Sequence, residues 1–173
     1  MMRSKSPTNS PKIIEHLLEL ADRNDRGALA VLRQGLGKPP GSVPGMYRHV
    51  QTYIPDRAPR EYEDAAYMVA ALFATHTSHC DGKPWDTNLG ASFRWLAKKV
   101  DNLETIERRF EVLLGSRREV LGERLRHSVS LLKSHDIPIN WYQLLQDITS
   151  WNRPGRPIQR SWARAFWSQA FKE

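Results

Sequence analysis

Arginine is the residue type in this sequence whose number and spacing could support a chemical function. Residues 87–173 carry 15 basic and 9 acidic side chains, whereas residues 1–86 carry 11 and 10. Eleven of those 15 are arginines. Because a planar guanidinium matches phosphate oxygens and stacks on flat rings, the pattern favours a surface that binds a polyanion, with nucleic acid as the first candidate. A generally solvated basic surface is the alternative.

These arginines form stripes on a helix predicted over 116–135. Arg117 and Arg124 are seven residues apart and share one stripe, whereas Arg126 lies on another. Arg118 lies about 80° from Arg126 around the same helix. The apolar residues of the helix occupy a different sector, so we expect the cations to project to solvent or to a partner.

The predicted last helix repeats the pattern. Arg160 and Arg164 are four residues apart, Arg156 comes one turn earlier, and Arg94 adds a basic edge to a preceding helix. In the preceding helices, pairing of Glu104 with Arg108 and of Glu119 with Arg126 is the alternative, and each such pair contributes only about a few tenths of a kcal/mol. Residues 124–172 hold eight basic and two acidic side chains, so most arginines there lack a local partner.

A second cluster, His76, His79 and Cys80, has residue types that could bind a metal ion. A structural zinc site needs four ligands, usually in two separated pairs, and the sequence has no second pair. A loop with surface histidines is therefore the better interpretation. The carboxylates at 61–64 fall at a predicted helix start, where they favour the positive end of the helix dipole. Without a G-x-S-x-G turn, a phosphate loop or a G-x-G-x-x-G fingerprint, the sequence predicts no catalytic residue, no metal and no cofactor. A nuclease is the least favoured hypothesis.

The elements that must position the arginines are helical throughout. The helical periodicity predicts an all-α protein of roughly eight helices and no significant sheet. Ser10 is the expected cap of the first helix, and Asp25 the expected cap of the second. The AAYMVAALFA stretch, apolar on nearly all sides, predicts a buried central helix. The expected helical stretches are 11–22, 25–37, 46–54, 59–76, 89–100, 103–115, 116–135, 141–149 and 158–172.

The polar stretch 77–88 is the candidate hinge or boundary between two small packed bundles. The prediction is an N-terminal bundle over 1–88 and a C-terminal basic bundle over 89–173. Trp141, Trp151, Trp162 and Trp167 crowd the second of these. Their helical spacing with leucines favours core packing, although exposed tryptophans could stack on bases.

Composition excludes several classes of protein. A single cysteine excludes a disulfide framework and fits a reducing cytosol. No apolar run approaches the roughly 18–20 residues that span a bilayer, and the first residues lack the apolar stretch of a secretory signal. Because 40% of the residues are hydrophobic, a sizeable core is expected. We therefore expect a cytoplasmic protein without membrane contact.

Six segments follow one another along nearly the whole chain: MYRHVQTYI, AALFATH, LGASFRWL, ERRFEVLLGSRREVLGERLRHSVSLL, IPINWYQLLQDITSW and RPIQRSWARAFW. In these segments and their order the chain resembles the CasB-type small subunit of the type I-E CRISPR surveillance complex, Cascade. The resemblance implies a non-catalytic, all-helical protein of two bundles, with two copies head to tail in the complex. It also implies contacts with the guide RNA, the target DNA and the displaced strand, and with the large and backbone subunits.

The resemblance also assigns residues. Basic positions of the family are matched at Arg33, Arg48, Arg60, Arg118, Arg126 and Arg156. Arg108 and Arg109 belong to the ERRF signature, and one of them is expected to face an acidic partner. Gly115 stands where some relatives have a basic residue, and Arg160 and Arg164 are additional. The predicted nucleic-acid contacts are Arg33, Arg48, Arg60, Arg94, Arg117, Arg118, Arg124, Arg126, Arg156, Arg160 and Arg164. The alternative is a protein-interaction module whose basic stripes dock on acidic surfaces of neighbouring subunits.

Overall fold

The protein is all-α. The computed structural model describes the backbone of residues 10–170 and the side chains as far as Trp167. Its helices are α1 (Lys12–Asp22), α2 (Arg26–Arg33), α3 (Tyr47–Val50), α4 (Arg60–Thr75), α5 (Pro84–Thr87), α6 (Leu89–Lys99), α7 (Leu103–Leu114), α8 (Arg118–Ser134), α9 (Trp141–Thr149) and α10 (Pro157–Ala170). Two short 3-10 turns, Pro44–Met46 and Gln51–Tyr53, flank α3. Within 10–170, eight of these helices have eight or more residues, which confirms the predicted all-α class of roughly eight helices. The one β contact in that range is an isolated bridge between His79 and Ile139.

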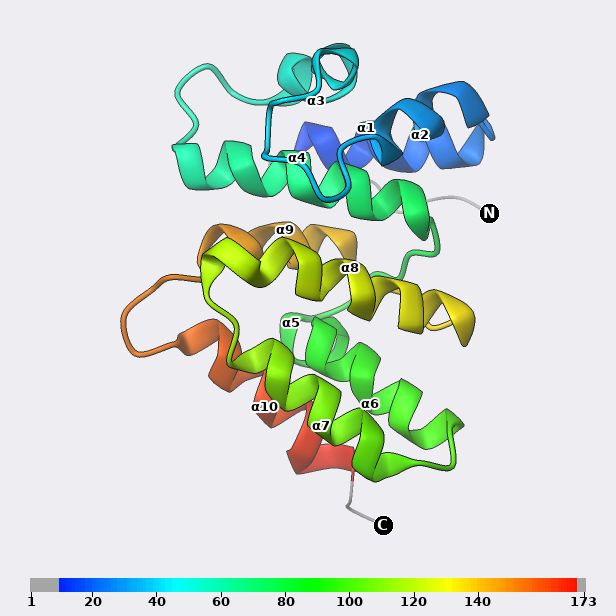
Figure 1. Ribbon diagram of the computed structural model, residues 1–173, viewed down its shortest axis with the longest axis vertical. Coiled ribbons are helices and arrows are strands. Elements are labelled where there is room, and N and C mark those ends of the chain that lie inside the picture. Colours follow the sequence, from blue (N-terminus) through cyan, green and yellow to red (C-terminus); the bar gives the residue numbers. More distant parts are fainter. Residues whose placement is uncertain (1–9, 171–173) are drawn as a thin grey trace.

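The helices lie in three layers (Figure 1). In that view α1 to α4 form the upper layer, α8 and α9 the middle layer, and α5, α6, α7 and α10 the lower layer. One apolar core runs through all three layers, from Ile13 in α1 to Phe166 in α10. The predicted boundary at residue 88 falls immediately before α6, but α5, which precedes it, packs against α6 and α10. That the two halves are separable bundles stays a prediction.

Helix α4 is the central element of the upper part, as its apolar stretch predicted. Its alanines and Phe73 are buried, and small side chains allow α9 and α2 to pack closely against α4. Phe73 meets the ring of Trp141 from α9 edge to face, with the ring centroids 5.4 Å apart. Trp141, Trp151 and Trp162 are all buried, which confirms their predicted place in the core.

Side-chain caps begin several of the helices. The Asp25 carboxylate accepts a hydrogen bond from the Ala28 amide at 3.0 Å, as predicted. Asn88 and Asn140 cap α6 and α9 in the same way. The prediction for Ser10 was wrong, because Pro11 occupies the cap position of α1 and no side chain caps that helix. Helix α8 also begins without a side-chain cap.

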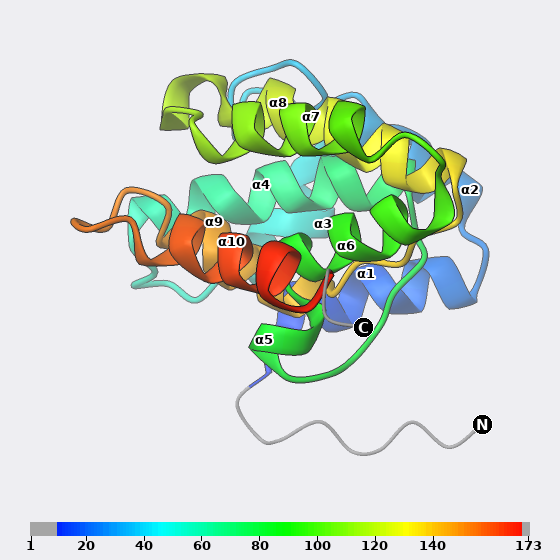
Figure 2. The same ribbon diagram turned by 90° about the horizontal axis from the view of Figure 1, so that it is seen from below.

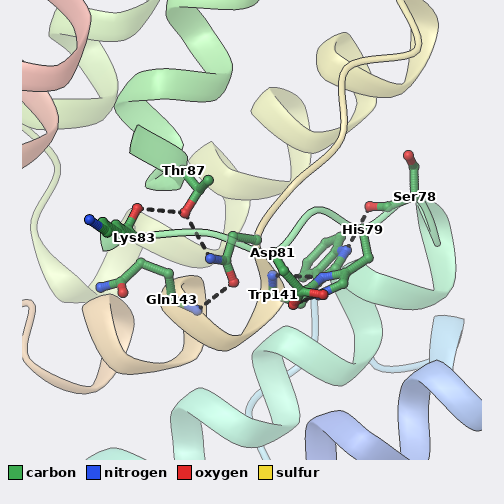
Figure 3. Close-up of polar contacts among 8 residues, drawn as sticks. Ser78, His79, Asp81, Lys83, Thr87, Trp141 and Gln143 are labelled. Carbon is green, nitrogen blue, oxygen red and sulfur yellow. Dashed lines mark hydrogen bonds and ion pairs between the residues drawn. The ribbon is translucent and has the colours of Figure 1, made fainter. Parts of the chain in front are cut away.

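The polar stretch 77–88 is held by long-range hydrogen bonds (Figure 3). The Ser78 carbonyl accepts from the Trp141 indole Nε1 at 3.0 Å and from the Ile139 amide at 3.3 Å. The Cys80 amide donates to the Ile139 carbonyl at 3.1 Å. Farther along, the Asn140 side chain donates to the Thr87 hydroxyl at 2.8 Å. The stretch is thus tied to the segment that leads into α9.

In the part of the chain that the structure describes, no helix combines the length and the apolar character needed to cross a membrane.

Candidate nucleic-acid interface

Three hollows open around α8. The α4–α8 groove, of about 700 Å³, lies between α4, the loop at 35–41 and α8. The α7–α8 hollow has about 280 Å³, and the α8–α10 hollow, at the N-terminal ends of these two helices, has about 350 Å³. His127 lines the first two, and Arg118 and Glu119 line the first and the third. Because they share lining residues, the three hollows adjoin one another around α8, and we call them together the α8 track.

The α8 track lies on one side of the molecule. Figure 2, seen from below, shows α7 and α8 together along that side, with α1 and α5 toward the opposite side. The described cationic side chains that line the track are Lys38, Arg108, Arg109, Arg117, Arg118, Arg124, Arg126, Arg153 and Arg156. The carboxylates that line it are Asp64, Glu119 and Glu123. Cations thus outnumber carboxylates by three to one, which suits an anionic partner.

The sequence of α8 explains how the cations are presented. Leu121, Leu125 and Val129 are fully buried and hold one side of the helix against the core. Arg124 and Arg126 flank that buried side on opposite edges. Arg124 lines the α7–α8 hollow and Arg126 the α4–α8 groove, so the two predicted stripes lie on different flanks of α8. Both side chains are exposed.

Three of the predicted contact residues also hold helix ends. Arg33 donates to the Ala74 carbonyl at 3.0 Å, Arg118 donates to the Ile148 carbonyl, and Arg156 donates to the Leu114 carbonyl. Each acceptor lies in the last turn of a helix, where the helix dipole attracts a cation. Arg33 and Arg156 remain exposed, whereas Arg118 is half-buried. These guanidinium groups therefore pack helices together as well as carrying charge.

Burial affects the charge of Arg118 directly. Desolvation lowers the pKa of its guanidinium, while the nearby carboxylates of Asp64 and Glu61 act in the opposite direction. Arg156 has a different constraint, because its φ of 54° is in the left-handed region that non-glycine residues rarely adopt. That backbone turn directs the chain from the loop after α9 into α10.

Arg94 departs from the prediction. Its side chain is only 6% exposed and donates to the Ala165 carbonyl at 2.7 Å, which ties α6 to α10. A buried guanidinium cannot reach a phosphate backbone, so we remove Arg94 from the candidate interface. Its neighbour Lys99 is exposed but donates to the His135 carbonyl at 2.6 Å.

The other predicted arginines lie outside the α8 track. Arg48, Arg160 and Arg164 are exposed on α3 and α10. Arg60 is exposed at the start of α4, with its Nε 3.9 Å from the Asp64 carboxylate. Arg33, described above, also lines none of the three hollows. Contacts of these residues with nucleic acid stay predictions.

The sequence analysis missed two cations that line the track. Lys38 and Arg153 lie in proline- and glycine-rich loops, KPPG and NRPG, and a search for helical stripes does not find them. Of the ERRF arginines, both are exposed, and Arg108 pairs with Glu104 at 2.9 Å as the spacing suggested. Arg109 lines the α7–α8 hollow.

The histidine and cysteine cluster lies at the start of the 77–88 stretch, with His76 just before it. We call the hydrogen bonds between this region and the segment that leads into α9 the clasp. His76 is buried, not on the surface as expected, and its Nε2 lies 2.6 Å from the Ile137 carbonyl. His79 pairs with Asp81 at 2.8 Å. Burial, aided by the charge of Asp81, raises the pKa of the Cys80 thiol to about 11, so this thiol stays protonated and unreactive near neutral pH. Among the described residues, no three His, Cys, Asp or Glu side chains converge as metal ligands do.

Comparison with known proteins gives consistent matches. The family model described as CRISPR-associated protein Cse2 matches residues 28–167. A CRISPR-associated protein Cse2 from Thermus thermophilus is 32% identical over 148 residues, which make up 84% of this chain and 82% of that protein. The crystal structure of M. ruber CasB has a TM-score of 0.75 at 32% identity and covers 91% of both chains. A chain of a CRISPR RNA-guided surveillance complex has a TM-score of 0.72 at 26% identity, over 89% of this chain and 92% of that one.

Proposed function

Because the chain belongs to the CRISPR-associated Cse2 family, we propose that it is the non-catalytic small subunit of a type I-E Cascade complex. In this role it binds nucleic-acid backbone without sequence preference. It stabilises the duplex of guide RNA and target DNA and holds the displaced DNA strand, in defence against viruses. Its protein partners are the large subunit, the backbone subunits and a second copy of itself.

The α8 track is the observation that carries this proposal. Nine cationic side chains against three carboxylates line the three adjoining hollows of the described chain. The salt bridges found among the described residues involve only one of those arginines, Arg108. None of the remaining arginines of the track is in a salt bridge with a carboxylate of the described chain. Phosphates can neutralise their charge with release of counterions.

The dimensions of the track suit a strand. Helix α8 has 17 residues and is therefore about 25 Å long. A nucleic-acid strand advances about 3.4 Å per nucleotide along a duplex, so the track spans about seven phosphates. Contacts along such a length read charge and shape, whereas base pairing within the complex reads sequence.

Three exposed arginines of the track provide the test. Within the described chain Arg117, Arg124 and Arg126 hold no helix end through a backbone carbonyl, so their replacement by alanine should leave the fold intact. The affinity of the full chain for a labelled duplex and for a single strand is measured by fluorescence anisotropy between about 50 and 200 mM salt. We expect the triple variant to bind more weakly and its salt slope to become shallower by about 2 to 3, since each phosphate contact contributes about 0.9.

A matched control uses the same loss of charge elsewhere. Arg23, Arg26 and Arg57 are exposed and line none of the three hollows. Their triple alanine variant should keep the affinity and salt slope of the original protein. Equal losses of affinity in both variants would show that only net charge matters. Unchanged affinity in the track variant would refute the proposal. Magnesium-dependent cleavage by the pure protein would contradict the non-catalytic role.

A protein-docking role is the second candidate, and exposed apolar side chains favour it. Val120 on α8 is 46% exposed, Val112 on α7 is 45% exposed, and Trp85 on α5 is 56% exposed. Tryptophan in particular is a typical anchor of protein interfaces. If this role is the main one, nuclease-treated partner subunits will capture the track variant and the original protein equally well.

A further inference from the structure

We propose that the α7 side of the α7–α8 hollow docks an acidic segment of another Cascade subunit, with one apolar side chain of that segment packed against Val112. The inference rests on the proposed function and deepens it, because it names the chemistry of a protein partner and the surface that receives it. The hollow measures about 280 Å³, and no carboxylate is among its described lining residues. It therefore carries cations of the α8 track without the carboxylates that line the other two hollows.

Three exposed side chains of α7 form the surface that we call the docking face. Val112 is 45% exposed, and Arg108 and Arg109, four and three residues before it, are exposed as well. Around the helix Val112 lies between the two arginines, so all three share one face of α7. An apolar side chain with a cation on either side is complementary to a partner segment that carries an apolar residue between carboxylates.

Apolar side chains continue from Val112 into the hollow. Leu113 and Phe93 are buried there, and Leu131 of α8 is partly buried. The volume falls just below the range of about 300 to 1,000 Å³ that small-molecule and cofactor sites occupy, so the hollow suits one large side chain of a partner. Burial of the exposed surface of Val112 and Leu131 against that side chain supplies the apolar part of the affinity.

The two arginines of the docking face differ in the partners that they already have. Arg108 pairs with Glu104 of its own helix at 2.9 Å, and both side chains are well exposed. Arg109 is in none of the salt bridges found among the described residues. Because a guanidinium can hold a carboxylate through two parallel hydrogen bonds, Arg109 is the residue that selects an acidic partner. Arg124, on the opposite wall of the hollow, remains available to the nucleic-acid strand.

The aliphatic surface of the docking face favours a protein segment over a nucleic-acid strand. Bases of a single strand gain affinity chiefly by stacking on exposed aromatic rings. Apart from the imidazole of His127, the aromatic ring among the described lining residues is that of Phe93, which is fully buried. Val112 and Leu131 offer a base no flat ring and no hydrogen bond, whereas they pack well against a leucine or a phenylalanine. We therefore expect the strand along the rest of the α8 track.

The first test measures capture of the full chain by its protein partners. The other Cascade subunits are treated with nuclease and immobilised, and affinity is measured by biolayer interferometry at about 150 mM salt. Val112→Asp removes the apolar contact and sets a carboxylate against those of the partner, so we expect the affinity to fall at least about tenfold. Arg109→Glu should cause a loss of similar size. Arg109→Lys, which keeps the charge but not the paired hydrogen bonds, should lose about threefold.

A matched control adds the same charge elsewhere on α8. Ser130 is exposed and lines none of the three hollows. Ser130→Asp should be captured as tightly as the original protein. Unchanged capture of both the Val112→Asp and the Arg109→Glu variants would overturn the inference, and so would equal losses from Val112→Asp and Ser130→Asp.

Strand binding by the same variants separates a protein partner from nucleic acid. In anisotropy titrations, Val112→Asp should lower the affinity for a single strand no more than Ser130→Asp does. A larger loss would show that the strand covers the docking face, which also overturns the inference. The proposed function has a different test, because the triple variant at 117, 124 and 126 keeps all three residues of the docking face. Normal strand binding by that triple variant would refute the proposed function without changing the capture result.

A cross-link identifies the chemistry of the partner. A photo-reactive amino acid is placed at position 112 of the full chain, and the assembled complex is irradiated and digested for mass spectrometry. We expect the cross-linked peptide to come from another subunit and to contain Asp or Glu residues on both sides of the cross-linked position. A peptide without carboxylates there, or a peptide from a second copy of this chain, would overturn the inference.

Discussion

The α8–α10 hollow and the α4–α8 groove are adjacent, share Arg118 and Glu119, and yet differ in what they can bind. The groove has twice the volume of the hollow, but its described lining holds three carboxylates beside Lys38, Arg118 and Arg126, and it includes apolar side chains such as Met68. The hollow has four arginines against one carboxylate, together with two helix N-terminal ends. The local balance of charge should therefore favour an anion in the hollow over one in the groove.

The largest expected effect is a loss of stability, and it comes from substitution of Gly90, which faces α10. Gly90 in α6 lies so close to α10 that a Cβ there would be 2.1 Å from the Trp162 carbonyl oxygen. Backbone cannot yield cheaply, so Gly90→Ala should lower the free energy of unfolding by more than about 3 kcal/mol and displace α10 from the hollow.

Gly122, which lines the groove, is the matched control. A Cβ at this position of α8 would meet only the Met68 side chain, whose methyl group lies at an ordinary 3.5 Å. Because alanine is the better helix former, Gly122→Ala should be neutral or stabilise by up to about 1 kcal/mol. Urea unfolding curves measure both variants, and similar losses in the two would contradict the contrast.

The next largest effect is a change of stability with pH, and it comes from Asp147, which is hydrogen-bonded to Trp162 of α10. This buried carboxylate accepts from the Trp162 indole at 2.7 Å and from Gln143 at 2.8 Å. Burial raises its pKa to about 6, although both hydrogen bonds oppose the shift. Between about pH 4 and 6 the folded protein thus holds a proton that the unfolded chain has lost, and stability falls as pH rises through this range, by about 3 kcal/mol in total.

Asp147→Asn should remove that pH dependence. An asparagine can still accept from Trp162, while Gln143 can turn its amide to accept from the new NH₂ group. His16 and His49 act in the opposite direction below their usual pKa of 6.5, since burial lowers the pKa of both. The quantity to measure is therefore the difference in unfolding free energy between variant and original protein at several pH values. A difference that stays constant from pH 4 to 7 would contradict the prediction.

A smaller effect is expected on single-strand affinity when cations of the two regions are replaced. Replacing Arg117 and Arg153 of the hollow by alanine should weaken single-strand binding about tenfold at low salt, since both lie there with little opposing charge. Replacing Lys38 and Arg126 of the groove should cost about threefold, because Asp64 and Glu123 line the same groove and repel a phosphate there. Anisotropy titrations at equal salt measure both pairs. The reverse order would place the strand in the groove.

The smallest expected effect is on strand binding and comes from Glu119, one of the two residues that the two regions share. Glu119 is exposed, lines both the hollow and the groove, and repels a phosphate at either. Glu119→Gln should therefore tighten strand binding about twofold and leave stability within about 0.5 kcal/mol. A loss of affinity would mean that this carboxylate positions a neighbouring arginine.

Local patterns predicted the architecture well and the arginines only in part. Asp25 and the AAYMVAALFA helix could be predicted because a cap and an apolar helix depend on neighbours in the sequence. Arg94 could not, because its acceptor, the Ala165 carbonyl, is 71 positions away. The same holds for Arg118 and Arg156, whose charge pattern looks like that of a free surface cation although each holds a distant helix end.

The rest of what the sequence did not predict lies in two loops and on the two flanks of α8. Lys38 and Arg153 join the track through loops whose course depends on tertiary packing. Helical spacing predicted that Arg124 and Arg126 lie on different stripes of α8. It did not predict which neighbouring helix would lie beside each stripe. Only the positions of α4 and α7 beside α8 decide that.

The clasp between 77–88 and the start of α9 has a consequence for the order of events in folding. Its hydrogen bonds from His76 and Trp141 join positions 61 to 63 residues apart, so it can close only after the intervening helices have formed and docked. Opening it exposes Trp141, whose ring is fully buried against Phe73 of α4. The Cys80 and Ile139 amides should therefore exchange their hydrogen with deuterium only through global unfolding, and their protection should report the stability of the whole protein.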